Sequence, residues 1–128
     1  IEYIPSMELP DEEYPMKMMT GRVLYHYNAC AMTDKTEGLN EISGHSFIEI
    51  NIEDAERIGI KDGDRVKVSS RRGSIETTAN VSGKTNQGEC WMPFHFLDGG
   101  ANWLTSDALD SISSTPEYKV CAVKVERM

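Results

Sequence analysis

The sequence has 128 residues, a formal net charge of −8, and 39% hydrophobic against 27% charged side chains. This length and composition suit one globular domain with a core of its own, while the acidic balance argues against nucleic acid and anionic membrane surfaces as partners. No apolar run approaches the roughly 20 residues that a membrane-spanning helix needs, so we expect no membrane insertion by this domain.

The predicted elements begin after residues 1–14, a segment rich in proline and acidic residues that is predicted to be an extended linker from upstream domains. The domain itself is expected over residues 15–128. It opens with a predicted strand over 15–20, which is followed by a turn signal at 20–22 and by a further extended stretch at 23–27.

The middle of the chain combines a loop, a strand and a helix. Residues 33–45 are polar and contain glycine, which predicts a loop, and residues 47–50 predict a short strand. Asn51 is then placed to cap the N-terminus of a helix whose first turn carries acidic residues. Gly59 is placed to end that helix in a left-handed conformation.

The second half of the chain predicts strands and one long loop. Apolar and polar residues alternate on both sides of a glycine turn over 64–82, which predicts a β-hairpin. Residues 90–96 are strand-like, but Pro93 would place that strand at a sheet edge or in a bulge. Residues 97–118 predict a loop with one helical turn, and residues 120–126 a final strand. About six or seven short strands with closely spaced turns predict a closed barrel or a sandwich.

Four regions carry side chains that suit ligand binding. Thr20-Gly21-Arg22 offers a close approach of the backbone, a hydroxyl and a guanidinium for phosphate oxygens. The other regions are His26-Tyr27-Asn28, the segment 93–105, and Thr115-Pro116-Glu117-Tyr118-Lys119 ahead of the last strand, where Lys119 could offer an ammonium to an anion. Taken singly, each is better explained as a turn, a strand end, an anchored loop or a solvated cation.

No catalytic or metal-binding motif accompanies these regions. His26 and Cys30 are four residues apart and Cys90 and His95 are five apart, whereas a zinc site favours tighter pairs. The three cysteines, of which the last is Cys121, are odd in number and widely spaced, which favours reduced and packed thiols over disulfides. The sequence therefore offers groups that bind a ligand, but no catalytic set.

Three stretches, taken in order, resemble the C-terminal domain of the molybdopterin oxidoreductases. They are PDEEYPMKMMTGRVLYHYNACAMT at 10–33, NIEDAERIGIKDGDRVKVSSRRGSI at 51–75, and NWLTSDALDSISSTPEYKVCAVKVE at 102–126. Within that family the sequence is most similar to the catalytic subunits of formate dehydrogenases, and nitrate reductases are near relatives. The resemblance covers nearly the whole chain.

The resemblance implies a mainly β fold with short helices, a six-stranded double-psi β-barrel. It also implies binding of molybdopterin guanine dinucleotide, which such enzymes hold in two copies around one molybdenum or tungsten atom. Asn28 departs from the family pattern, because relatives often have histidine there. The positions that the resemblance assigns to cofactor binding are Thr20, Gly21, Arg22, Val23, Leu24, Tyr25, His26, Tyr27, Asn28, Ala29, Phe94, His95, Asn102 and Lys119.

In such a parent enzyme, the metal ligand and a 4Fe–4S cluster would belong to upstream domains of the same polypeptide, and an electron-transfer subunit would be a partner. The parent would oxidise formate to CO2, and this domain alone would be inactive. We expect a cytoplasmic parent, with a periplasmic one as the alternative. Other functions are a nitrate reductase-type member of the family and a stand-alone barrel that binds proteins. A self-cleaving decarboxylase is disfavoured, because Gly73-Ser74 falls in the predicted hairpin turn.

Overall fold

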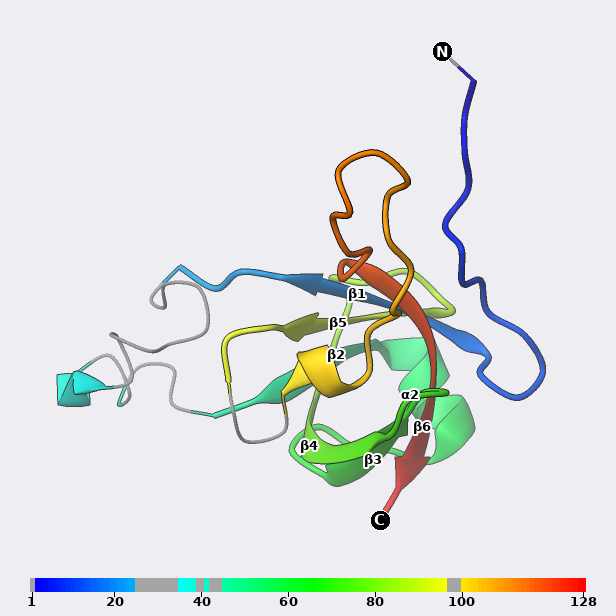
Figure 1. The fold of residues 1–128 in the computed structure, drawn as a ribbon. Helices are drawn as coiled ribbons and strands as arrows, with labels where there is room; N and C mark the ends of the chain where they lie inside the picture. Colours follow the sequence, from blue (N-terminus) through cyan, green and yellow to red (C-terminus); the bar gives the residue numbers. More distant parts are fainter. Residues whose placement is uncertain (1, 25–34, 39–40, 42–44, 97–99) are drawn as a thin grey trace.

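The computed structural model describes residues 2–24, 35–38, 41, 45–96 and 100–128. In this part of the chain, strands close into a barrel in the order β1-β5-β2-β4-β3-β6 (Figure 1). The helices with bounds inside the described residues include α2 (Ile52–Ile58) and a short 3-10 helix, η2 (Ala101–Trp103). The mainly β fold with short helices is therefore confirmed. The strands are β1 (Met16–Gly21), β2 (Phe47–Asn51), β3 (Arg65–Ser69), β4 (Ser74–Ser82), β5 (Glu89–Pro93) and β6 (Val120–Arg127).

The strand pairing combines local and distant neighbours. β3 and β4 form the antiparallel hairpin that the alternation over 64–82 predicts. β1 runs parallel to β5, and β2 runs parallel to β4. Parallel neighbours require long crossover connections, so each of these pairs joins segments that are far apart in the sequence. As a result, the ends of β1 and β5 lie at the same end of the barrel.

The core lies inside the barrel and follows the alternation of the strands. In β1, Met16 and Met18 are buried, whereas Lys17 and Met19 between them are half-exposed. Because successive side chains of a strand point to opposite faces, one set fills the interior and the other faces outward. The buried side chains that share the interior are Met16, Met18, Ile48, Ile50, Ala55, Ile60, Val66, Val68, Ala79, Cys90, Met92, Ala101, Leu104, Cys121, Val123 and Val125.

Both predicted ends of the helix are confirmed in α2. The Asn51 side chain accepts the backbone N–H of Glu53 at 3.0 Å, and Gly59 ends the helix with φ of 81°. Asp54 is buried and accepts the N–H of Gly88 at 2.6 Å, which ties the helix to the turn before β5.

Two local predictions are wrong. Thr20 and Gly21 form the end of β1 rather than a turn, because they pair with Met92 and Pro93 of β5. Pro93 lies neither at a sheet edge nor in a bulge. It is the last residue of β5 and pairs with Gly21 of β1, whereas the pairing of β5 with β2 ends at Trp91, so no ladder there needs the N–H that proline lacks.

The remaining predictions concern the stretch after β1, the cysteines and membrane insertion. Leu24 lies in a turn, so the expected extended stretch is broken there, and residues 25–27 lie outside the described residues. Cys90 and Cys121 are buried free thiols, as predicted, while Cys30 lies outside the described residues. The described residues contain no helix with the length and apolar character needed to cross a membrane.

Candidate functional site

The candidate site is built at the end of the barrel where β1 and β5 terminate together (Figure 1). The parallel register places Gly21 beside Pro93, and the bond from the Phe94 N–H to the Gly21 carbonyl extends this pairing by one step. Residues 20–23 and 94–95, two of the predicted regions, therefore lie side by side.

A third region joins them through Thr20. The Thr20 hydroxyl donates to the carbonyl of Tyr118 at 2.7 Å, and the Thr20 N–H donates to the carbonyl of Lys119 at 3.0 Å. Thr20 is 8% exposed, so its hydroxyl is committed inside the protein and holds the segment before β6 in place. Lys119, by contrast, is exposed.

Aromatic rings surround the end of β5. The rings of Phe94 and His95 stack with centroids 4.8 Å apart, and Tyr118 meets Phe94 edge-on at 6.3 Å. The guanidinium carbon of Arg22 lies 6.0 Å from the Phe94 centroid, a distance compatible with a cation–π contact. Arg22 is exposed and Phe94 half-buried, so a cation and an aromatic ring meet at the surface.

His95 supports this arrangement from within. It is fully buried, and its Nε2 accepts the backbone N–H of Val23 at 2.8 Å. A ring nitrogen that accepts a hydrogen bond carries no proton, so the neutral ring has its proton on Nδ1. His95 thereby fixes the path of the chain just after Arg22.

Gly21 is required by a close neighbour on the outer face of the barrel. A Cβ at this position would lie 2.7 Å from Nε1 of Trp91, so the indole packs directly on the glycine. A pocket of about 390 Å³ adjoins this ring. Among the predicted site residues, Val23 alone contributes to the lining, which consists of Met19, Val23, Phe47, Glu49, Lys84, Thr85 and Trp91.

The remaining predicted residues are placed differently. Asn102 is exposed on η2, which packs on β4. The Leu24 side chain is 89% exposed. Residues 25–29, with the predicted contacts Tyr25, His26, Tyr27, Asn28 and Ala29, lie outside the described residues.

A family model described as "Molydopterin dinucleotide binding domain" matches residues 16–122. The chain belongs to this family. The match runs from the first residue of β1 into β6 and so includes five complete strands of the barrel and the start of the sixth.

Relatives and one solved structure extend this family assignment. The chain is 45% identical over 128 residues to F420-dependent formate dehydrogenase 2 subunit alpha of Methanococcus maripaludis, covering 100% of the chain and 19% of the relative. It is 43% identical to a nitrate reductase of Symbiobacterium thermophilum, covering 94% and 16%. The chain thus spans less than a fifth of the length of these relatives.

The fold is shared with acetylene hydratase from Pelobacter acetylenicus, with a TM-score of 0.80 and 15% identity over 91% of this chain and 19% of that one. The predicted six-stranded double-psi β-barrel is confirmed by the closed barrel of six strands and by this shared fold.

The side chains of this molybdopterin dinucleotide-binding domain fit such a cofactor. A dinucleotide carries phosphates and flat rings, which call for cations and for aromatic or amide groups. Arg22 and Lys119 supply exposed cations at one end of the barrel, although the chain has a net charge of −8. Phe94 supplies a ring beside Arg22.

The structure adds two residues to the candidate site that were not among the predicted cofactor contacts, although Tyr118 lies in one of the predicted regions. Tyr118 packs on Phe94 and accepts the Thr20 hydroxyl, and Trp91 packs on Gly21. The alternation in β5 marks Trp91 as outward-facing, but no signal in the sequence shows what it contacts.

Proposed function

We propose that this chain binds molybdopterin guanine dinucleotide at the end of the barrel formed by β1, β5 and the segment before β6. The observation that carries the proposal is the meeting of Arg22 with the Phe94 ring, beside Thr20, whose N–H bonds the backbone carbonyl of the exposed Lys119, in a domain of the dinucleotide-binding family. Arg22 and Lys119 would hold phosphate oxygens, and Phe94 would lie against the cofactor.

Each neighbouring residue has a supporting role in this proposal. His95 holds the N–H of Val23, and Thr20 holds the carbonyls of residues 118 and 119, so the two cations are presented from fixed backbone. Contacts from Asn102 on η2 and from residues 24–29 would complete the site. Fixed donors bind an anion better than mobile ones, because less side-chain and backbone freedom is lost on binding.

We further propose that the parent enzyme is of the formate dehydrogenase type and oxidises formate to CO2. The support is 45% identity along the whole chain to a formate dehydrogenase alpha subunit. The bound cofactor would supply a molybdenum or tungsten centre for two-electron chemistry, with its metal ligand and a 4Fe–4S cluster in upstream domains and an electron-transfer subunit as partner. A nitrate reductase is the second candidate, because one such relative is 43% identical.

The cofactor site is tested with GDP, the nucleotide half of the proposed cofactor, added to the 128-residue chain. We expect amide chemical shifts to change at Gly21, Arg22, Phe94, Asn102 and Lys119, and not along α2. Arg22→Gln should weaken binding about tenfold or more, because it removes charge-assisted hydrogen bonds.

Arg65→Gln is the matched control, since Arg65 is an exposed arginine on β3 in a surface pair with Glu76. It should leave the affinity for GDP unchanged. The proposal fails if GDP shifts no amide in the millimolar range, or if the Arg22 and Arg65 variants bind equally well.

A further inference from the structure

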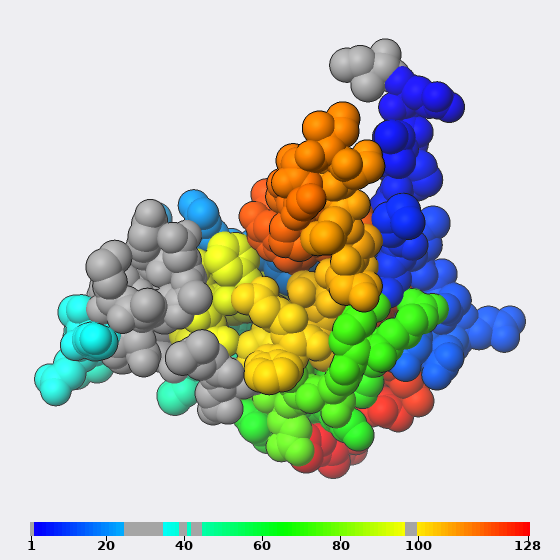
Figure 2. Space-filling view, in the orientation of Figure 1, coloured from blue at the N-terminus to red at the C-terminus, as the bar shows by residue number. Residues whose placement is uncertain are grey.

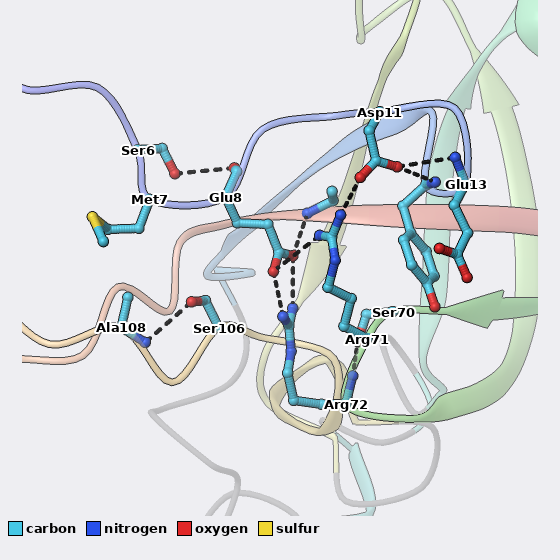
Figure 3. Close-up of polar contacts among 12 residues, drawn as sticks. Ser6, Met7, Glu8, Asp11, Glu13, Ser70, Arg71, Arg72, Ser106 and Ala108 are labelled. Carbon is cyan, nitrogen blue, oxygen red and sulfur yellow. Dashed lines mark hydrogen bonds and ion pairs between the residues drawn. The ribbon is translucent and has the colours of Figure 1, made fainter.

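The N-terminal segment is held against the barrel by a carboxylate and a guanidinium (Figure 3). Both Glu8 oxygens face Arg72, and one of the two bonds, from Arg72 Nη2 to Glu8 Oε1, measures 2.8 Å. The side chains of Glu8 and Arg72 are 10% and 24% exposed. A forked pair sheltered from water in this way is both stronger and more directional than a surface ion pair.

The Glu8 carboxylate also completes the sheet. The pairing of β3 with β6 ends at Ser69 and Lys124, while Ala122 pairs with β1 on its other side. The N–H of Ala122 therefore has no strand partner toward β3, and Glu8 Oε1 accepts it at 2.8 Å. A residue that precedes the barrel thus fills a gap in the barrel's own hydrogen bonding.

Arg72 connects this pair to the loop that follows η2. Its Nη2 donates to the carbonyl of Leu104 at 2.6 Å, and the carbonyl of Trp103 lies against Gly73 of the same β3–β4 turn. The Nε of Arg72 is buried and has no hydrogen-bond partner among the described residues, so the guanidinium is largely removed from water. Asn102 is two residues before Leu104.

We propose that Arg72, oriented by Glu8, is a positioning residue that fixes residues 101–108 on the barrel and thereby sets where Asn102 is presented. That Asn102 then meets the cofactor rests on the function proposed above. Arginine suits this role because one planar group serves a carboxylate and a carbonyl at once, whereas lysine offers a single ammonium. Through Arg72, Glu8 in the segment before the barrel would influence the position of Asn102, which lies about a hundred residues later in the sequence.

The test is amide hydrogen exchange in the 128-residue chain with Arg72→Met, Arg72→Lys and, as control, Arg71→Gln. Arg71 is the neighbouring arginine and pairs with Asp11 and Glu8, but its bonds do not reach the Leu104 carbonyl. The probes are the amides of Trp103 and Leu104, which are hydrogen-bonded inside the loop.

In the Arg72→Met variant these two amides should exchange about tenfold faster or more, while amides of β2 and β5 keep their rates. In Arg72→Lys, the exchange rates of these two amides should lie between those of Arg72→Met and the wild type. If Arg72→Met fails to fold, Arg72→Lys provides the comparison. Arg71→Gln should match the wild type. With GDP present, Arg72→Lys should lose the shift at Asn102 and keep the shift at Arg22.

A charge-reversed pair, Glu8→Arg with Arg72→Glu, separates positioning from mere stability. It restores an ion pair, but a glutamate cannot donate to the Leu104 carbonyl. The amides of Trp103 and Leu104 should therefore still exchange as fast as in the Arg72→Met variant. Unchanged loop exchange in both single Arg72 variants, or equal acceleration in every strand, would overturn the proposal. If the wild type binds no GDP, the proposed function fails, while the exchange comparison still decides whether Arg72 positions the loop.

Discussion

Replacing Gly21 by alanine tests the contact between the end of β1 and Trp91. The added Cβ would lie 2.7 Å from Trp91 Nε1 and 3.1 Å from Cε2 and from Cζ2, all closer than van der Waals contact. Overpacking of this kind costs about 1–3 kcal/mol. Trp91 is half-buried and lines the pocket of about 390 Å³, so its ring can yield in part, and we expect a loss of about 2 kcal/mol in the free energy of unfolding.

Urea unfolding followed by tryptophan fluorescence and by circular dichroism would measure this loss. With a slope of about 2 kcal/mol/M, the midpoint should fall by about 1 M. Gly83→Ala is the control, because a Cβ at Gly83 has open space around it. It should change the free energy by less than about 0.5 kcal/mol.

A double-mutant cycle with Trp91→Leu assigns the effect to the indole. The smaller side chain should make room for the methyl group, so Gly21→Ala should cost about 1–2 kcal/mol less in that background. An equal cost in both backgrounds, or a Gly21→Ala variant as stable as the Gly83→Ala control, would refute the steric explanation.

Two further predictions concern groups whose ionisation is altered by the fold. The Arg72 guanidinium holds the pKa of Glu8 below its usual value of 4.5, so this pair stabilises the fold above pH 4.5 and the stabilisation is lost as the pH falls below that value. Glu8→Gln should therefore be less stable than the wild type at neutral pH, with a gap that narrows on acidification, and a gap that stays constant from pH 7 to about pH 3 would contradict this. Burial raises the pKa of Cys121 to about 12 and raises that of Cys90 as well. At pH 8 an alkylating reagent should label these two cysteines only in urea, as mass spectrometry of their peptides would show, and rapid labelling of the native chain would be the contrary result.

The helix and the hairpin were predictable because their determinants are local. Asn51 and Gly59 carry the signals for both ends of α2 within a few residues of the helix. The alternation over 64–82 fixes the faces of β3 and β4, and the turn between them fixes their pairing. Such features are decided by backbone conformation and side-chain period.

The parallel pairing of β1 with β5 was not predictable from the residues themselves. It joins segments about seventy residues apart, and their side-chain alternation would suit other partners equally well. For this reason the sequence predicts a turn at Thr20-Gly21, because the residues have turn character, whereas β5 supplies the pairing that makes them a strand. The resemblance to a family, and not the periodicity, pointed to the correct barrel.

The same distinction applies to the candidate site. Arg22, Phe94 and Lys119 have side chains whose chemistry alone suits a phosphate or a ring, so inspection of the sequence finds them. Trp91 and Tyr118 matter through their neighbours, and those neighbours are known only once the strands are paired.

The bond between Glu8 and the Ala122 N–H bears on where the domain should be cut for work in isolation. The family match begins at Met16, and a polypeptide trimmed to that residue would lack the acceptor for Ala122 and the counter-charge of Arg72. Exposing both groups together would weaken the seam between β3 and β6. A piece that keeps these native hydrogen bonds therefore starts at or before Glu8, several residues ahead of the barrel's first strand.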